Sequence, residues 1–154
     1  MSRAFTKEDE GDFDELPDRY QSASPNYVTR AGLAALRRQE EELRQCLAAL
    51  AKEGPRAREA RRDLRYFAGR IASAILVEPQ AGAAQEVRFG AAVDLRLKNG
   101  RARRVVIVGQ DEAEGSAEKI AWDCVLATAL IGAKPGDRVE TEEDGVLVVE
   151  KIGY

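Results

Sequence analysis

Two stretches with the same helical spacing of apolar residues flank a Gly54-Pro55 pair, and this arrangement constrains the fold more than any other feature. Before the pair, residues in steps of three and four form one heptad seam: Leu33, Leu36, Glu40, Leu43, Leu47 and Leu50. After it, the same steps recur at Ala57, Ala60, Leu64, Phe67, Ile71 and Ala74. Two matched seams around a short breaker predict an antiparallel coiled-coil hairpin over residues 27–77. Thr29 is a suitable N-cap for a first helix that runs to about Glu53, and each arm should be roughly 30–35 Å long.

Beyond Pro79 the apolar period changes from helical spacing to two, which indicates strands. "EVRFGAAVDLRL" and "RARRVVIVG" predict one hairpin around Asn99-Gly100, and "DRVET" and "GVLVVEKI" predict a second around Asp144-Gly145. Between them, "KIAW" reads as a short strand and "CVLATALIG" as a helix that ends near Gly132. The fold class expected is α+β: the hairpin, then an antiparallel sheet domain with one helix over residues 80–154.

Residues 1–26 have no apolar periodicity and carry a strong acidic excess. Residues 1–20 contain seven acidic residues against three basic ones, and Gly11, Pro17 and Pro25 interrupt the segment. We interpret residues 1–26 as a flexible acidic tail.

Several classes of function are disfavoured by what the chain lacks. It contains no histidine and no phosphate-cradling Gly-rich loop, and Cys46 and Cys124 are too few and too far apart for a disulfide framework or a zinc site. We therefore expect no enzyme and no catalytic residues. Apolar stretches such as Ile71–Val77 are far short of the ~20 residues that cross a bilayer, so we expect a cytoplasmic protein with no membrane contact.

The net charge of −3 conceals an uneven distribution. Residues 52–70 hold seven basic against three acidic residues, whereas residues 110–154 hold eleven acidic against four basic ones. A duplex would meet mostly negative surface, so a free-standing DNA-binding protein is not expected. Any one of these runs can also be a solvated face.

Four motifs in order resemble the C-terminal domain of the Gre transcription elongation factors: "VRFGAAVDL", "VVIVGQDEAE", "KIAWDCVLATALIGAKPGDRVE" and "EKIGY". The helical hairpin stands where that family has its N-terminal coiled coil, so the resemblance covers about residues 27–154. "FTKEDEGD" and "PNYVT" are also similar to the leader of GreB-like members.

The resemblance implies an FKBP-like C-terminal domain that docks on bacterial RNA polymerase at the rim of its secondary channel. The coiled coil would enter the channel and contact nascent RNA and DNA only indirectly. It further implies that the loop of Trp122, Asp123, Cys124, Val125 and Leu126 touches the polymerase. We expect no cofactor. Glu40 interrupts the seam, which disfavours a long intermolecular coil, so we expect a monomer.

The hairpin tip departs from the family, whose cleaving members carry a motif of the type Gly-Asp-x-Ser-Glu-Asn-x-x-Tyr and hold a second Mg²⁺ with acidic residues. This hairpin is shorter, and the residues at its tip are Glu53, Arg56, Arg58, Glu59, Arg61 and Arg62. An arginine about 8 Å away repels a dication by roughly 1 kcal/mol even at the dielectric of water, so no metal site is expected. The arginines could contact acidic polymerase surface or RNA phosphates, or simply pair with glutamates along the helix.

The docking loop departs as well, because cleaving members usually carry Trp-Asp-Ser-Pro-Leu there. Cys124 and Val125 replace a capping serine and a first-turn proline, which should weaken the cap by about 1 kcal/mol unless Asp123 caps instead. For Trp122 we favour a core position over a binding platform. For Cys124 we favour a packed thiol over a catalytic one, because no base accompanies it.

Four functions are weighed. The first is a polymerase-binding elongation regulator with weak or absent stimulation of transcript cleavage. The second is a non-cleaving competitor of Gre factors at the secondary channel, which the short basic hairpin favours. The third is an FKBP-type peptidyl-prolyl isomerase, against which stands the scarcity of aromatic residues in the C-terminal domain. The fourth is a self-associating coiled-coil module.

Overall fold

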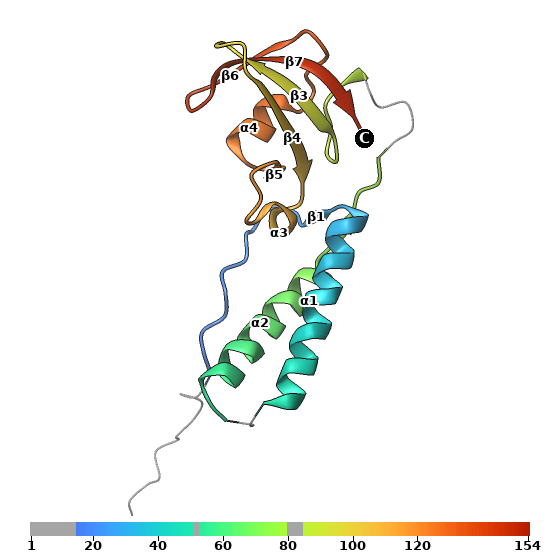
Figure 1. Cartoon of the computed structure of the whole chain (residues 1–154). Coiled ribbons are helices and arrows are strands. Elements are labelled where there is room, and N and C mark those ends of the chain that lie inside the picture. Colours follow the sequence, from blue (N-terminus) through green and yellow to red (C-terminus); the bar gives the residue numbers. More distant parts are fainter. Residues whose placement is uncertain (1–14, 51–52, 80–84) are drawn as a thin grey trace, which may run out of the picture.

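The computed structural model describes residues 15–50, 53–79 and 85–154. It consists of a helical hairpin and a curled sheet with a short helix packed on it, which is the α+β class that the sequence predicts (Figure 1). The turn of the hairpin points away from the sheet, and the other end of the hairpin meets the sheet domain. No helix in the described ranges is long and apolar enough to cross a membrane.

The first helix of the hairpin, α1, spans Arg30–Ala49 and begins where the sequence predicts. Thr29 is its N-cap, and the Thr29 hydroxyl accepts a hydrogen bond from the backbone N–H of Gly32 at 2.9 Å. The helix ends before Leu50, whose extended backbone leaves the helical region, rather than at about Glu53. The residues just beyond, 51–52, lie outside the described ranges.

The second helix, α2, spans Pro55–Ala72, with Gly54 at the N-cap position. Gly54 has a φ of 144°, a backbone conformation that side chains with a β-carbon rarely adopt, and Pro55 occupies the first helical turn, where its missing N–H costs nothing. Near the turn, Ala57 and Ala60 are buried. Small side chains therefore let the two helices approach closely at the tip.

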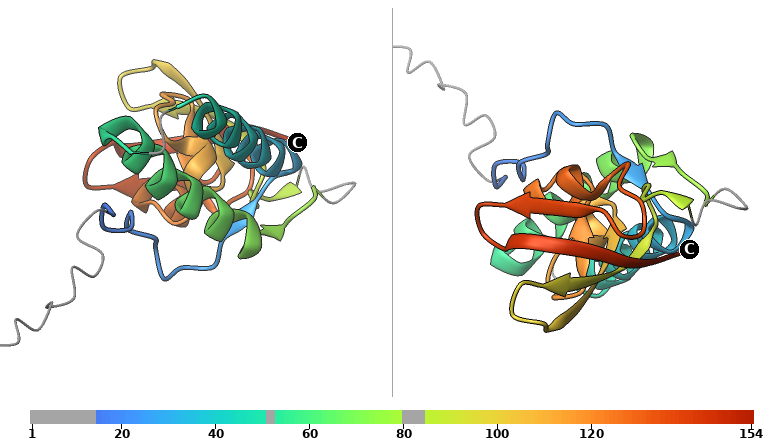
Figure 2. Two further views of the ribbon diagram at one scale, coloured as in Figure 1. Left: turned by 90° about the horizontal axis from the view of Figure 1, so that it is seen from below. Right: turned by 90° about the horizontal axis from the view of Figure 1, so that it is seen from above.

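The sheet contains five strands in the order β5-β4-β3-β7-β6. Their bounds are Ala92–Leu97 for β3, Ala102–Val108 for β4, Lys119–Ala121 for β5, Arg138–Thr141 for β6 and Gly145–Gly153 for β7. The predicted turns at Asn99-Gly100 and Asp144-Gly145 join β3 to β4 and β6 to β7, each as an antiparallel pair. Seen from above, the sheet is uppermost and the hairpin helices lie beneath it (Figure 2).

One edge of the sheet differs from the expected antiparallel pattern, because β5 pairs with β4 in parallel. The sheet is therefore mixed. The reason is the connection: the chain leaves β4 and passes through a short helix, α3 (Gln110–Ala113), before it returns in the same direction as β5. α3 is not among the elements that the sequence predicts.

The core lies between the sheet and α4, which spans Val125–Leu130. Alternate residues of β3, β4 and β7 face it, as the period of two requires, and Leu126, Ala127 and Leu130 close it from the helix. The largest side chains with less than 2% exposure are Leu95, Ile107, Leu130, Leu147, Val87, Val93, Val105, Val108 and Val149.

The chain before the hairpin is only partly described. Residues 1–14 of the predicted tail lie outside the described residues. Residues 15–26 follow a path beside α2 (Figure 1), and β1 (Tyr27–Val28) then pairs in parallel with β2 (Ile75–Leu76) just beyond the end of α2. This small ladder joins the two ends of the hairpin where it meets the sheet domain.

Candidate functional site

The five residues for which docking is expected comprise the loop between β5 and α4, residues 122–124, and the first two residues of α4, and they are presented in different ways. Asp123 is exposed, Val125 is 73% exposed, and Leu126 is buried in the core. Ile131, just after α4, is a further large apolar side chain at the surface, 43% exposed. Residues 122–126 therefore offer one exposed carboxylate and one exposed apolar side chain, with Ile131 at the opposite end of α4 as a second apolar group. Such a combination is suited to contact with a protein surface.

Cys124 caps α4, so the alternative in which Asp123 caps the helix does not occur. The Cys124 thiol accepts a hydrogen bond from the backbone N–H of Ala127 at 3.4 Å. Sulfur is a weak acceptor, so this cap is weaker than the one that a serine hydroxyl would provide. The Asp123 carboxylate does not cap α4 and is available for other contacts.

Trp122 lies against the core rather than standing out as a platform. Its ring meets that of Tyr27 edge to face, with 4.9 Å between centroids, and Tyr27 also contacts Phe89 at 6.2 Å. Tyr27 belongs to β1, so this aromatic group joins the start of the hairpin to the docking loop.

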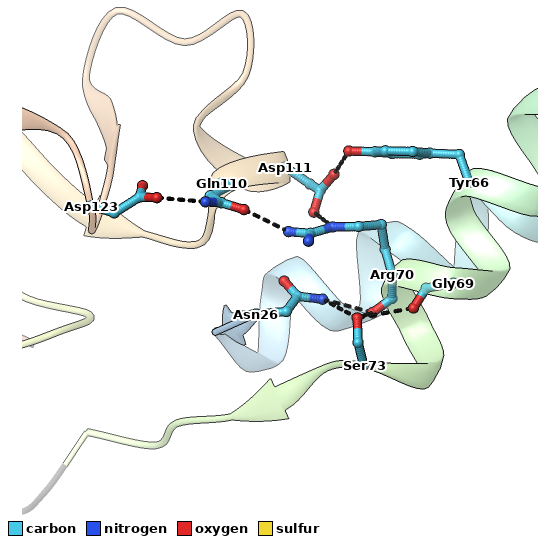
Figure 3. A network of polar contacts seen from close by, with 8 residues as sticks. All are labelled: Asn26, Tyr66, Gly69, Arg70, Ser73, Gln110, Asp111 and Asp123. Atoms are coloured by element: carbon cyan, nitrogen blue, oxygen red, sulfur yellow. Dashed lines mark hydrogen bonds and ion pairs between the residues drawn. The ribbon is translucent and has the colours of Figure 1, made fainter. Parts of the chain in front are cut away.

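A chain of polar contacts runs from Asp123 to the hairpin (Figure 3). The side-chain amide of Gln110 donates to Asp123 Oδ2 at 2.5 Å, and Gln110 Oε1 accepts from Arg70 Nη2 at 3.1 Å. Arg70 Nε donates to Asp111 Oδ2 at 2.6 Å. The contacts join the docking loop, α3 and α2 in one network.

Tyr66 completes this network from the preceding turn of α2. Its hydroxyl donates to Asp111 Oδ1 at 2.5 Å. Burial first, and then the hydrogen bond and the negative charge of Asp111, raise the pKa of Tyr66 to about 12. The phenol therefore remains protonated and continues to donate at all physiological pH values.

The residues predicted for the hairpin tip lie at the end of the hairpin remote from the sheet domain (Figure 1). The structure does not bring them together with the docking loop. Glu53, Arg56 and Glu59 are exposed, whereas Arg58, Arg61 and Arg62 are half-buried. Arg58 and Arg61 are engaged in contacts, and Arg62 pairs with Asp63, with 3.0 Å between Arg62 Nη2 and Asp63 Oδ1.

The acidic groups nearest the tip do not form a cation site among the described residues. Asp63 already faces two guanidinium groups, those of Arg62 and of Arg19, the latter at 3.7 Å. Across residues 15–50, 53–79 and 85–154, no cluster of three or more histidine, cysteine or acidic side chains could hold a metal ion.

The polar residues of α3 were missed by the sequence analysis as functional candidates. Besides Gln110 and Asp111, Glu112 contacts both parts of the molecule: it accepts from Thr29 Oγ1 at 2.5 Å and from Lys119 Nζ at 3.0 Å. Three consecutive polar residues that follow a buried strand after one glycine are a signal for an interface. Their partners lie in other elements, so the sequence does not identify them.

Comparison with known proteins identifies the family. The profile described as "Transcription elongation factor, GreA/GreB, C-term" matches residues 82–152. Transcription elongation factor GreB of Neisseria meningitidis serogroup B is 34% identical over 82% of this chain and 94% of its own length, and GreB of Haemophilus ducreyi is 28% identical over 86% and 96%. A solved GreA/GreB structure from Nitrosomonas europaea covers 85% of this chain and 99% of its own, with 20% identity and a TM-score of 0.42.

The class of protein is defined by two findings. The fold is a helical hairpin followed by a curled α+β domain, and the sequence is related along most of its length to named elongation factors. The chain belongs to the GreA/GreB family of transcription elongation factors.

Proposed function

We propose that this protein binds bacterial RNA polymerase and regulates transcript elongation, with weak or absent stimulation of transcript cleavage. Membership of the GreA/GreB family supports the partner and the process. The single observation that carries the finer proposal is the tip: its described residues offer arginines and scattered glutamates rather than a group of carboxylates that could hold Mg²⁺.

The docking surface that we propose is the loop of residues 122–126, at the rim of the polymerase secondary channel. Exposed Asp123 would provide a charge-assisted contact, and exposed Val125 would provide an apolar one. Because the hairpin extends away from the sheet domain, a domain docked at the rim would direct the tip into the channel. RNA and DNA would be contacted only indirectly, the protein would act as a monomer without a cofactor, and any RNA hydrolysis would be catalysed by the polymerase.

Binding of Asp123→Ala to the cognate polymerase tests the docking surface. We expect at least about tenfold weaker binding, because a charged contact at an interface is lost. Glu140→Ala is the matched control, since Glu140 is an exposed acidic residue on β6, outside the loop. Equal affinity of both variants and the unmodified protein would refute the assignment of the loop.

The tip is tested with RNA cleavage in a stalled, backtracked elongation complex that contains Mg²⁺. We expect little or no acceleration by this protein. Acceleration that disappears in Glu53→Ala or Glu59→Ala would instead show a metal-assisting tip and overturn the proposal.

A second function, competition with cleaving Gre factors for the channel, is favoured by the engagement of Asp63 with arginines. A competitor would suppress cleavage that an added Gre factor stimulates, in proportion to its own occupancy of the polymerase. An elongation regulator that does not compete would leave this stimulated cleavage unchanged even when the polymerase is limiting.

A further inference from the structure

Arg70 is the one charged residue that is buried in the described part of the chain, with 3% exposure. It lies in the last turn of α2, at the end of the hairpin that meets the sheet domain. Its backbone carbonyl accepts from Asn26 Nδ2 at 2.7 Å, and Asn26 is itself buried. A buried guanidinium requires partners, and those of Arg70 come from the other part of the molecule.

Both oxygens of Asp111 face the hairpin. Oδ2 accepts from Arg70 Nε at 2.6 Å and Oδ1 accepts from Tyr66 at 2.5 Å, so two successive turns of α2 are bonded to one carboxylate (Figure 3). The Asp111 side chain is only 11% exposed. Two short bonds from one helix to one carboxylate fix a direction as well as a distance.

Gln110 extends this arrangement to the docking loop. Its carbonyl oxygen faces Arg70 and its amide nitrogen faces Asp123, so the same side chain is held from both sides. Asp123 thereby shares one bonded network with the hairpin, although it lies 53 positions further along the chain than Arg70.

Outside this network, the hairpin and its leading strand meet the sheet domain through the Tyr27 ring, which contacts Trp122 and Phe89, and through the Glu112 carboxylate, which accepts from Thr29. The narrow space beside α3 is lined by Val28, Gly32, Leu36 and Gly109, together with Asp111 and Glu112. Apart from the aromatic contacts of Tyr27, few large apolar groups meet between the two parts. Parts of a chain joined by a small interface move relative to each other by default. A buried ion pair gains little stability over an apolar pair, but its geometry is specific.

We propose that Arg70 and Asp111 are positioning residues that hold the hairpin at one angle to the loop of Asp123. Gln110, which bonds both Arg70 and Asp123, fixes the position of the Asp123 side chain relative to the hairpin. Loss of this pair leaves the hairpin and the sheet domain folded but free to adopt several relative orientations. The description of the loop as a docking surface rests on the proposed function, whereas the fixed angle is a property of the protein alone.

The test measures the distance between two nitroxide labels by pulsed electron paramagnetic resonance, without polymerase. One label is placed on Cys46, which is exposed on α1, and the other on Lys98→Cys, at the exposed β3–β4 turn, in a Cys124→Ser background. We expect one narrow distance distribution for this background. Asp111→Asn should make it roughly twice as broad, or split it, because the small interface no longer defines one angle.

Two further variants make the outcome decisive. Arg70→Lys keeps a positive charge opposite Asp111, so this variant folds even if Asp111→Asn does not. Lysine lacks the planar guanidinium that reaches Asp111 and Gln110 together. Arg70→Lys should therefore broaden the distance distribution too. Ile107→Val thins the sheet core and lowers the melting temperature without touching the network, and its distribution should remain narrow.

A distribution that stays narrow and unshifted in folded Arg70→Lys would overturn the proposal, as would equal broadening in Ile107→Val. Because no polymerase is present, neither result depends on whether residues 122–126 dock on it. Failure of the docking experiment with Asp123→Ala would leave the positioning role intact, so the two failures can be distinguished.

Discussion

The Glu112 carboxylate lies directly over Gly32, so that a β-carbon at Gly32 would stand 2.6 Å from Glu112 Oε2. The same carboxylate accepts from the Thr29 hydroxyl that caps α1, which places a negative charge at the N-terminal end of that helix. Glu112 belongs to α3 of the sheet domain. The glycine thus leaves room for an acidic group that joins the two parts of the molecule.

Gly32→Ala should therefore destabilise the protein, although alanine is normally the better helix former by about 1 kcal/mol. The added methyl displaces a carboxylate that is only 10% exposed and held by Thr29 and Lys119. We expect the free energy of unfolding to fall by about 1 kcal/mol. In a Glu112→Ala background the same substitution should raise it by about 0.5–1 kcal/mol.

Urea denaturation of the unmodified protein, Gly32→Ala, Glu112→Ala and the double variant measures how the effect of Gly32→Ala on the free energy of unfolding depends on Glu112. If Gly32→Ala has the same effect in both backgrounds, the carboxylate does not account for the glycine.

The stability should fall at high pH because of Tyr66. Its pKa is raised to about 12 in the folded protein, above the value of about 10 for an unfolded tyrosine. The neutral phenol is therefore favoured by folding, so its contribution is complete below pH 10 and is lost as the pH rises through about 12. Because the ring is only partly buried, we expect the loss to be about 1 kcal/mol rather than the full value of the pKa shift.

The measurement is the difference in unfolding free energy between the unmodified protein and Tyr66→Phe, followed from about pH 9 to about pH 12. This difference should shrink over that range. Tyr20→Phe serves as the control, because Tyr20 is 86% exposed and its removal should leave the pH profile unchanged. A constant difference for Tyr66→Phe would mean that the phenol does not contribute in this way.

Features that depend on neighbouring residues could be predicted from the sequence. The Thr29 cap, the Gly54-Pro55 break and the hairpin turns at Asn99-Gly100 and Asp144-Gly145 were predicted and are observed. Each is determined by the conformational preferences of two to four adjacent residues. The expectation that residues 122–126 dock on a partner rests on the resemblance to the Gre family, because periodicity alone does not distinguish this segment from any other helix start.

Features that depend on distant residues could not be predicted. The parallel pairing of β5 follows from the crossover through α3, and a helix of four residues is too short to give a periodic signal. The bond between Arg70 and Asp111 joins residues 41 positions apart. From sequence alone, Arg70 is one more member of a basic run, and only the fold shows that it is buried.

The cap of α4 can be strengthened at Cys124. A serine at position 124 would accept the hydrogen bond from the Ala127 N–H through oxygen rather than sulfur. The stronger cap is partly offset because the apolar contacts of the thiol with the core are lost. We expect Cys124→Ser to raise the free energy of unfolding by about 0.5 kcal/mol in net terms. Thermal denaturation under reducing conditions tests this. Cys46→Ser is the matched control, because Cys46 is exposed on α1 and caps nothing. A melting temperature that rises no more in Cys124→Ser than in Cys46→Ser would contradict the weak-cap explanation.

The segment before the hairpin should contribute to the stability of α2 through Arg19. The Arg19 guanidinium lies over the Tyr66 ring, 3.9 Å from its centroid, and is 3.7 Å from Asp63. Arg19→Met keeps the aliphatic stem and removes the charge, so it isolates the cation–π and ionic contacts, and we expect a loss of about 1 kcal/mol.

Hydrogen exchange can localise this effect, since the amides of α2 should exchange faster while those of β3 and β7 do not change. Tyr20→Ala provides the control from the adjacent position, because its exposed ring covers nothing on α2 and its loss should leave exchange unaltered. Equal protection of α2 in Arg19→Met and in the unmodified protein would mean that the Arg19 guanidinium lies over Tyr66 without stabilising the helix. Faster exchange confined to α2 would instead make this segment a structural part of the hairpin, with Arg19 adding to the bonds that Arg65 of α2 makes to Glu15, Leu16 and Asp18.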